Sequence, residues 1–183
     1  MTFEGIPGLV ETRVSFGETT LVVDSARIVE ACTYLRDEEG FNYLSDISAA
    51  DYLGWPDSTS RVAGYTGSAA GRDINAPGSA GLARLPQTKP ARFSVSYHLV
   101  ALRADPTRVR VQVWLDDGEP LQSVVGVWPT ADWHERENFD LMGIVFEGHP
   151  NLRRLIMDDD WEGHPLRKDY PIGGEPVRFS GEE

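Results

Sequence analysis

The chain has 183 residues, of which 40% are hydrophobic and 25% are charged, and its formal net charge is −12. This length is sufficient to bury a core, whereas an acidic surface of this size repels phosphate backbones, so we expect no nucleic-acid partner. No apolar run approaches the roughly 20 residues of a membrane-spanning helix, and the amino-terminal sequence lacks a secretory signal pattern, so we also expect no direct membrane span.

The first part of the chain predicts two strands on either side of one helix. Residues 18–23 and 41–47 are strand-like, the first of them as a β-branched run. A helix is expected between them, from Asp24 or Ser25 to about residue 39, and Gly40 is suited to ending it. The apolar face of this helix would consist of Ile28, Ala31, Cys32 and Leu35.

Residues 56–90 have a different composition, dominated by Gly, Ala, Ser and Pro without apolar periodicity. A segment of this kind within a domain predicts a flexible surface insertion. A loop that becomes ordered against a partner is the alternative interpretation.

The second part of the chain returns to regular patterns. Apolar and polar residues alternate over residues 93–99 and 109–115, which predicts two strands, and the apolar run 124–128 is expected to be a third. A helix is predicted over residues 131–142, with Thr130 as its cap and Gly143 at its end.

The order of these elements predicts an α+β fold. We expect a two-layer sandwich with a mostly antiparallel or mixed sheet, helices on one face, and an extended C-terminal arm. Residues 1–143 would form the α+β domain, with the insertion at 56–90, and residues 144–183 would form an extended docking arm containing a possible short strand at 153–157.

The segment 135–171 carries the highest density of ionisable groups and repeats the tetrapeptide Glu-Gly-His-Pro. A metal site is one interpretation, but His134, His149 and His164 stand 15 residues apart without a local ligand motif. Acid–base chemistry without a metal is a second, although no nucleophile elbow or phosphate-binding loop accompanies it. We favour a third, in which the two Gly-His-Pro turns frame an extended strip rich in interface residue types.

Several motifs follow one another in this segment. They are Glu135-Arg136-Glu137, Asp140-Leu141-Met142-Gly143-Ile144, Gly148-His149-Pro150, Arg153-Arg154 and the run WEGHPLRKDYP at residues 161–171. In this order they resemble the 30 kDa subunit family of respiratory complex I, which in bacteria is the C subunit of NADH-quinone oxidoreductase. The resemblance covers most of residues 41–171 apart from the insertion, which is longer than the family's usual connection. Asp158 stands where the family usually has proline.

The resemblance implies a non-catalytic scaffold subunit in the peripheral arm of the complex, on the cytoplasmic side of a bacterial membrane. Its partners would be the large quinone-site subunit and neighbouring iron–sulfur subunits, which hold the FMN, the iron–sulfur clusters and the quinone. No cofactor, metal or catalytic residue is expected in this chain, and its single cysteine, Cys32, cannot ligate a cluster by itself. The suspected interface residues are Arg136, Asp140, His149, Arg153, Arg154, Trp161, His164, Arg167, Lys168, Asp169 and Tyr170.

We expect the charges of this arm to lack partners within the chain until another polypeptide supplies them. Two other functions remain open from the motifs alone. One is the equivalent subunit of a membrane-bound hydrogenase-type complex, and the other is a freestanding metal-dependent hydrolase that uses the three histidines named above.

Overall fold

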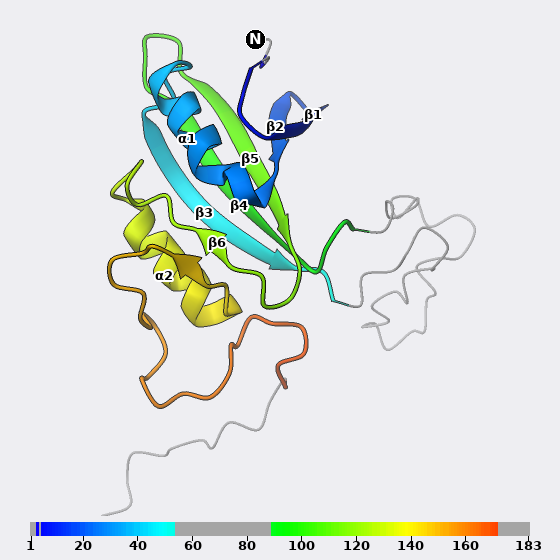
Figure 1. Cartoon of the computed structure of the whole chain (residues 1–183), viewed down its shortest axis with the longest axis vertical. Coiled ribbons are helices and arrows are strands. Elements are labelled where there is room, and N and C mark those ends of the chain that lie inside the picture. Colours follow the sequence, from blue (N-terminus) through cyan, green and yellow to red (C-terminus); the bar gives the residue numbers. More distant parts are fainter. Residues whose placement is uncertain (1–2, 4, 54–88, 172–183) are drawn as a thin grey trace, which may run out of the picture.

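A computed structural model describes residue 3 and residues 5–53 and 89–171 of the chain. Its main feature is a five-stranded mixed sheet with the strand order β1-β2-β5-β4-β3 (Figure 1). The strands of this sheet are β1 (Leu9–Ser15), β2 (Glu18–Val23), β3 (Tyr43–Asp51), β4 (Phe93–Ala101) and β5 (Thr107–Leu115). The predicted insertion lies outside the described residues except for residues 89 and 90, and so does the end of the chain from residue 172.

The sheet is antiparallel except at one junction, where β2 and β5 run parallel. The alternation in the central strands places one set of side chains on the inner face, and Tyr97, Val111 and Val113 in this set have no exposed surface. The predicted α+β class with a mixed sheet is therefore confirmed.

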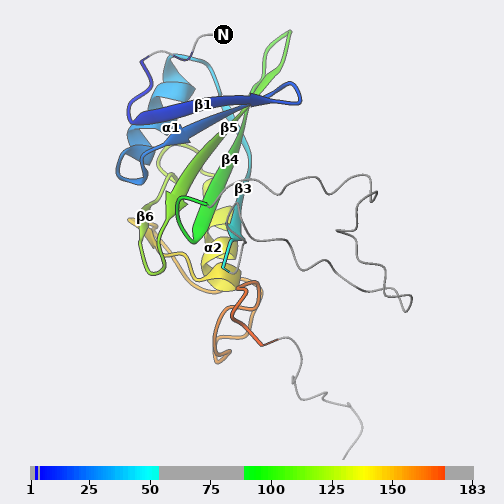
Figure 2. The same ribbon diagram turned by 90° about the vertical axis from the view of Figure 1, so that its right-hand side faces the viewer.

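Two helices cover the inner face of the sheet (Figures 1 and 2). The first, α1 (Ile28–Asp37), follows a 3-10 turn at Ser25–Arg27, whose start is capped by the Asp24 carboxylate. The second, α2 (Ala131–Met142), ends as predicted at Gly143, which adopts a left-handed conformation with φ 71°. In the part of the chain that the structure describes, no helix combines the length and hydrophobicity needed to cross a bilayer.

The apolar run 124–128 is not a strand, and this prediction is wrong. The backbone N–H groups of Val127 and Trp128 both donate to the carbonyl of Val124, at 2.9 and 3.0 Å, so the segment forms a tight turn with buried side chains. The strand of this region is instead the two-residue β6 (Leu121–Gln122), which pairs in parallel with β7 (Phe146–Glu147).

The possible strand at residues 153–157 is also absent, because the N–H groups of residues 155–157 donate to a side-chain carboxylate rather than to a neighbouring strand. The structure adds two strands that the sequence did not predict, β1 and the short β7, and it extends β3 to Asp51. Residues 144–171, hereafter the arm, contain no regular element except β7. The beginning of the arm pairs with β6, and its later, orange-to-red part lies beneath α2 in Figure 2.

Candidate subunit interface

The arm is fixed to α2 by a buried carboxylate, that of Asp140. Its Oδ2 accepts the backbone N–H groups of Leu155, Ile156 and Met157 at 2.9, 2.7 and 2.9 Å. Its Oδ1 accepts Nη1 of Arg154 at 2.7 Å. These four donors come from consecutive residues of the arm, so one helical side chain determines the local course of the arm. We call this group the Asp140 cluster.

The same contacts set the ionisation of Asp140. Burial alone would raise the pKa of this carboxyl, because its charged form loses hydration. The three backbone N–H groups and the Arg154 guanidinium outweigh burial and lower the pKa from 3.8 to about 2. Asp140 is therefore a charged anchor at neutral pH and is not available as a proton donor.

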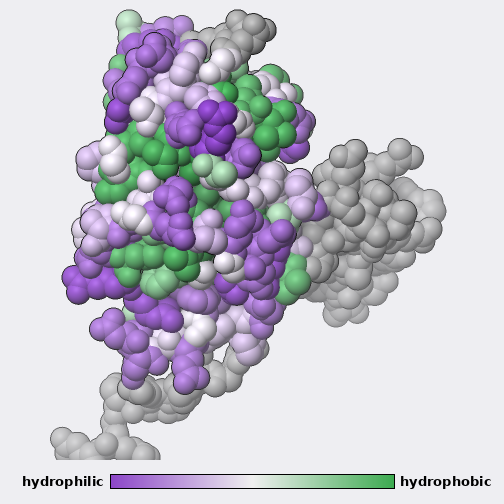
Figure 3. All heavy atoms as spheres, in the orientation of Figure 1, coloured by the Kyte–Doolittle hydropathy of each residue, from purple (hydrophilic) through white to green (hydrophobic). Residues whose placement is uncertain are grey.

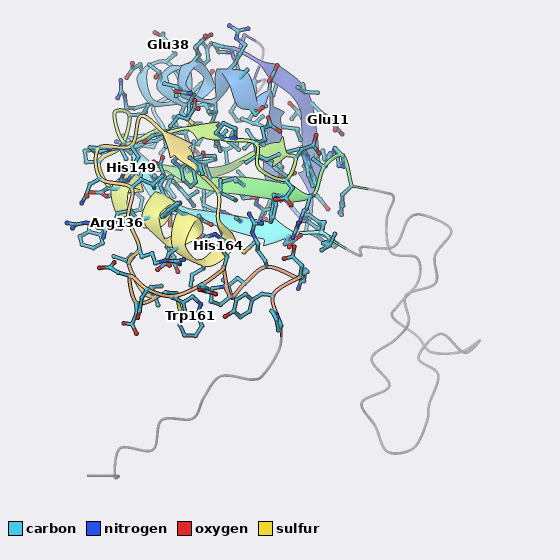
Figure 4. The ribbon with its side chains drawn as sticks, turned by 60° about the horizontal axis from the view of Figure 1, so that its bottom comes forward. Glu11, Glu38, Arg136, His149, Trp161 and His164 are labelled. Carbon is cyan, nitrogen blue, oxygen red and sulfur yellow. The ribbon has the colours of Figure 1, made fainter. Side chains whose placement is uncertain are left out.

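The Arg154 guanidinium also folds the arm onto itself. Its Nη2 donates to the carbonyl oxygens of Trp161 and Gly163, at 2.9 and 3.2 Å. One residue further on, Nδ1 of His164 lies 2.8 Å from the carbonyl oxygen of Asp140, and the imidazole meets the Phe139 ring edge-on. Figure 4 shows His164 beside α2. The arm thus returns to the helix at a second point.

The end of α2 forms a third contact with the arm. Nε of Arg167 donates to the carbonyl oxygen of Met142 at 2.7 Å, which places a positive charge where the last carbonyls of the helix lack intrahelical partners. A Cβ on Gly143 would lie 2.6 Å from Cδ2 of His164 and 2.8 Å from Nη2 of Arg167. Glycine at this position therefore permits both the left-handed turn and the close approach of the arm.

A second cluster fixes the arm to the sheet. Arg92, which precedes β4, pairs with the carboxylates of Asp51, Asp117 and Asp169 at 3.0, 2.6 and 2.8 Å. The buried Asp51 also accepts the backbone N–H of Lys168 at 2.9 Å. We call this group the Arg92 cluster. It joins the end of β3, the turn after β5 and the arm.

The pKa values in the Arg92 cluster follow from these contacts. Burial works against the charged form of Asp51, but its bonds from Arg92 and from the backbone N–H groups of Lys168 and Leu53 lower its pKa overall. The hydrogen bond from Arg92 likewise lowers the pKa of Asp169. Both carboxylates remain charged and attractive to Arg92 at neutral pH.

The amino-terminal half of α2 uses separate contacts. The buried Glu135 accepts the backbone N–H of Val124 at 2.7 Å and the hydroxyl of Ser123 at 2.6 Å, and burial raises its pKa. The imidazole of His149 is also fully buried, with Nε2 3.2 Å from the carbonyl oxygen of Asp132. These side chains hold the turns on either side of β6 and β7.

Other side chains of α2 and the arm are directed outward. Trp133, Ile156 and Leu166 are 60%, 58% and 57% exposed. The side chains of Arg153, near Ile156 in the sequence, and of Lys168, near Leu166, are exposed as well. We call these five residues the outer arm surface. Arg136 connects this surface to the anchored layer, because it donates to the carbonyl oxygens of Arg153 and Arg154 and its guanidinium lies over the Trp133 ring.

The residues proposed from the sequence therefore fall into two groups. Those whose side chains are held within the chain are Arg136, Asp140, His149, Arg154, His164, Arg167 and Asp169, and for them the expectation of unpartnered charges is wrong. Arg153 and Lys168 expose their side chains. The carbonyl oxygen of Trp161 accepts a hydrogen bond from Arg154. Tyr170 packs against Gly163, where an added Cβ would lie 2.9 Å from the tyrosine ring. Contact of these residues with another subunit stays a prediction.

Sequence reasoning missed the Arg92 cluster. Arg92 and Asp51 are separated by 41 positions, and the antiparallel pairing of β3 with β4 across the insertion brings them together. The available signal was the pairing register itself, because Asp51 lies opposite Phe93, the residue next to Arg92.

The histidines considered for a metal site have separate partners. His134 faces Asp46, His149 faces Asp132, and His164 meets the backbone of Asp140. Among residues 3, 5–53 and 89–171, no three His, Cys, Asp or Glu side chains come together in a way that could hold a metal ion.

Comparison with known proteins identifies the class. A family model described as the 30 Kd subunit of respiratory-chain NADH dehydrogenase matches residues 21–176. The C subunit of NADH-quinone oxidoreductase from Methylobacterium sp. (strain 4-46) is 40% identical over 178 residues, which cover 96% of this chain and 66% of that protein. The protein of the same name from Geotalea uraniireducens (strain Rf4) is 37% identical over 167 residues, covering 91% and 80%. The chain spans about two thirds of the Methylobacterium relative's length.

Solved structures agree with this match. A trypsin-resistant fragment of Nqo5 has a TM-score of 0.57 and 30% identity, with coverage of 78% of this chain and 89% of that chain. A chain of the membrane-bound sulfane sulfur reductase, an archaeal respiratory membrane complex, has a TM-score of 0.63 at 19% identity, covers 92% and 81%, and shows a shared fold only.

The chain is therefore a member of the 30 kDa subunit family of respiratory-chain NADH dehydrogenase. The resemblance found in its motifs is confirmed, and the family is one of subunits of an oxidoreductase complex.

Proposed function

We propose that this chain is a non-catalytic structural subunit in the peripheral arm of a proton-translocating NADH-quinone oxidoreductase. It packs against the large quinone-site subunit and the neighbouring iron–sulfur subunits, and so supports electron transfer from NADH to quinone. These partners hold the FMN, the iron–sulfur clusters and the quinone, and they keep the chain at the cytoplasmic side of the bacterial membrane as a peripheral component. Family membership supports this proposal.

The observation that carries the proposal is an irregular arm that is anchored from within while its outer surface is left open. Fixing a flexible backbone costs conformational entropy, about 1–2 kcal/mol per residue. The Asp140 and Arg92 clusters offset this cost inside the chain, because the first binds the middle of the arm at residues 154–157 and the second binds its end at residues 168 and 169. A partner that meets the outer arm surface therefore does not have to order it, which favours affinity.

The state of the one cysteine fits a scaffold without a redox centre. Cys32 lies fully buried on the apolar face of α1, and this burial raises the pKa of its thiol well above the usual value. A metal or cluster ligand must be a thiolate, so this side chain is suited to packing rather than to ligation.

A pair of matched double variants tests the docking role. Arg153→Ala with Ile156→Ser removes one exposed cation and one exposed apolar side chain from the outer arm surface. Leu102→Ser with Arg103→Ala makes the same kind of change at the β4–β5 turn, where Leu102 is 59% exposed. We expect the first pair, and not the second, to lower the amount of assembled complex several-fold, as measured by native gels and by NADH:quinone activity of membranes.

The thermal midpoint of each isolated variant provides the necessary check, because both pairs alter exposed side chains and are expected to leave it within a few degrees of wild type. Equal assembly of the two pairs, with both folded, would contradict the docking role of the outer arm surface.

Purification of the tagged wild-type chain from native membranes tests the assignment to the complex. We expect flavin-binding and iron–sulfur subunits of an NADH-quinone oxidoreductase to be recovered with it and identified by mass spectrometry. A nickel-binding subunit among them would favour the hydrogenase-type alternative. Recovery without any electron-transfer subunit would overturn both.

A further inference from the structure

The β1–β2 hairpin exposes a row of apolar side chains at the opposite edge of the sheet from β3. Val10 and Val14 are 70% and 72% exposed, and Phe16 at the hairpin tip is 104% exposed. Figure 3 shows hydrophobic surface over this hairpin. Thr12 and Val14 lie opposite Leu21 and Thr19 of β2, so they share the face that the helices cover farther along the sheet, but α1 does not shield them. β1 is therefore an edge strand with exposed apolar side chains.

The conformation of the hairpin turn indicates that Phe16 is placed there for contact with another molecule, because this residue type does not favour the turn. Phe16 and Gly17 both have positive φ angles, 52° and 82°, as a two-residue type I′ turn requires. Glycine and asparagine suit this conformation, whereas an aromatic residue adopts it at a cost. Since Phe16 packs against no core, the turn holds an exposed aromatic ring in a strained backbone position.

From Glu11 to Ser15, beyond a β-bulge at Val10, the hydrogen-bonding groups of β1 alternate between its two edges. Ser15 and Glu18 close the two-residue hairpin as a hydrogen-bonded pair, and Arg13 with Thr20 forms the next such pair. The N–H and C=O groups of Thr12 and Val14 are therefore directed to the other edge. Among the strands of the described residues, none pairs with β1 at that edge.

The sequence of β1 is complementary to itself. Read from residue 10 to residue 14 it is Val-Glu-Thr-Arg-Val, and in the opposite direction it is Val-Arg-Thr-Glu-Val. If two copies pair antiparallel about Thr12, each Glu11 faces an Arg13, and the regular pairing ends at Val10, the extra residue of a β-bulge between Leu9 and Glu11. In this pairing the outward-directed N–H and C=O groups of one copy face those of the other. Glu11 and Arg13 then occupy the non-hydrogen-bonded positions, where opposing side chains are closest.

We propose that the β1 edge is a self-association surface and that a second copy of this chain binds there, joining two five-stranded sheets into one. Within one strand Glu11 and Arg13 already form an exposed ion pair at 2.6 Å, and pairing of the strands extends it to four alternating charges. The exposed Val14 of each copy then lies on the same face of the joined sheet. Pairing of free edge strands through main-chain bonds is a general mode of association.

This surface is independent of the proposed function. β1 and β3 form opposite edges of the sheet, and α2, which carries Trp133 of the outer arm surface, packs against β3 (Figure 1). β1 also lies before residue 21, where the family match begins. The association concerns the free full-length chain, and variants of β1 leave the Asp140 and Arg92 clusters unchanged.

Sedimentation velocity of the full chain over a range of concentrations tests the proposal. We expect a monomer–dimer equilibrium for the wild type. Arg13→Glu replaces two opposite-charge pairs by two like-charge pairs, so it is expected to weaken the dimer about tenfold. The double swap Glu11→Arg with Arg13→Glu rebuilds both pairs in reverse and should restore the wild-type constant. Arg103→Glu, with the same change in net charge at a distant exposed turn, should leave it unaltered.

A cross-link locates the two-fold axis. Thr12→Cys places one cysteine on the axis in each copy, so oxidation should yield a disulfide-linked dimer. Val14→Cys should yield none, since the two copies of residue 14 lie on opposite sides of the axis, and the native Cys32 is fully buried. A chain that stays monomeric at every concentration, a double swap as weak as Arg13→Glu, or linkage of the Thr12→Cys variant only to a different protein would overturn the proposal.

Discussion

The sheet with its two helices and the arm are held by different kinds of interaction. In the first region, fully buried apolar side chains such as Leu21, Ile28 and Leu99 fill the space between the sheet and the helices. The start of the arm joins this core through Ile144 and Phe146. In residues 153–171 of the arm, by contrast, the main contacts are hydrogen bonds and ion pairs from Asp140, Arg154 and Arg92 to backbone groups and carboxylates. Apolar burial does not depend on pH, whereas the contacts of the arm depend on the charge of a few carboxylates.

This difference implies two levels of stability in one chain. Apolar packing couples the strands and helices, so they are expected to unfold together. The arm is attached at a small number of points, and it is therefore expected to open locally at a lower free energy than global unfolding. The predictions that follow separate these two levels.

The largest effect is expected in the apolar region. Leu99 on β4 is 1% exposed, so Leu99→Ala leaves a cavity and should lower the free energy of unfolding by about 2–5 kcal/mol. Urea denaturation followed by circular dichroism measures this loss. Leu102→Ala, at a residue 59% exposed, is the matched control and should change stability by no more than about 0.5 kcal/mol. If the stability lost in Leu99→Ala were confined to the arm, the sheet with its helices and the arm would not be stabilised separately.

A smaller and local effect is expected at the Asp140 cluster. Asp140→Ala leaves three backbone N–H groups and the Arg154 guanidinium without their acceptor, which should cost the attachment of the arm about 2–4 kcal/mol. Hydrogen exchange should show loss of protection at residues 155–157, with the sheet amides nearly unchanged. Asp158→Ala, at an exposed residue of the arm, should change neither. Uniform loss of protection across the sheet would show that the arm and the core unfold as one unit.

The periodic parts of this architecture were predictable. Strict alternation identified β4 and β5, and apolar spacing with a terminal glycine identified α1 and α2, because each has one buried and one exposed side. β1 was missed since six of its seven residues are exposed, which leaves no alternation to detect. The run at residues 124–128 was misread because a short apolar run has the same appearance in a strand and in a buried turn.

The contacts within the candidate interface were not predictable from spacing. The arm motifs pointed to the right segment, but the partners of Asp140 lie 14–17 positions away, and those of Arg92 lie in three separate parts of the chain. A sequence shows which groups carry charge, while the chain's own folding determines which of them it pairs internally. Side chains such as Asp140 and Arg154 were thus assigned to contacts with another subunit, although the chain itself supplies their partners.

Acid should release the arm before it unfolds the sheet. The pKa of Asp140 is lowered to about 2 in the folded chain from 3.8, so its contribution to stability is present above pH 3.8 and is lost as the pH falls towards 2. A shift of this size corresponds to about 2 kcal/mol. The lowered pKa values of Asp51 and Asp169 act in the same direction. Hydrogen exchange of residues 155–157 between pH 5 and pH 2, corrected for intrinsic rates, measures this loss, and Asp140→Asn should remove most of the pH dependence.

The smallest effect is expected at the hinge between the two regions. Gly143 and Gly148 both have left-handed backbones, with φ angles of 71° and 79°, so alanine strains either position by about 1 kcal/mol. Only at Gly143 would the new Cβ also collide with His164 and Arg167, whereas at Gly148 nothing lies within 4 Å. Gly143→Ala should therefore cost about 1 kcal/mol more than Gly148→Ala, and the added loss should appear in the protection of the arm and in its susceptibility to trypsin, because the side chains displaced belong to the arm. If the two variants behave alike, the close approach of His164 and Arg167 to the helix end contributes nothing to holding the arm, and its attachment rests on Asp140 and Arg92 alone.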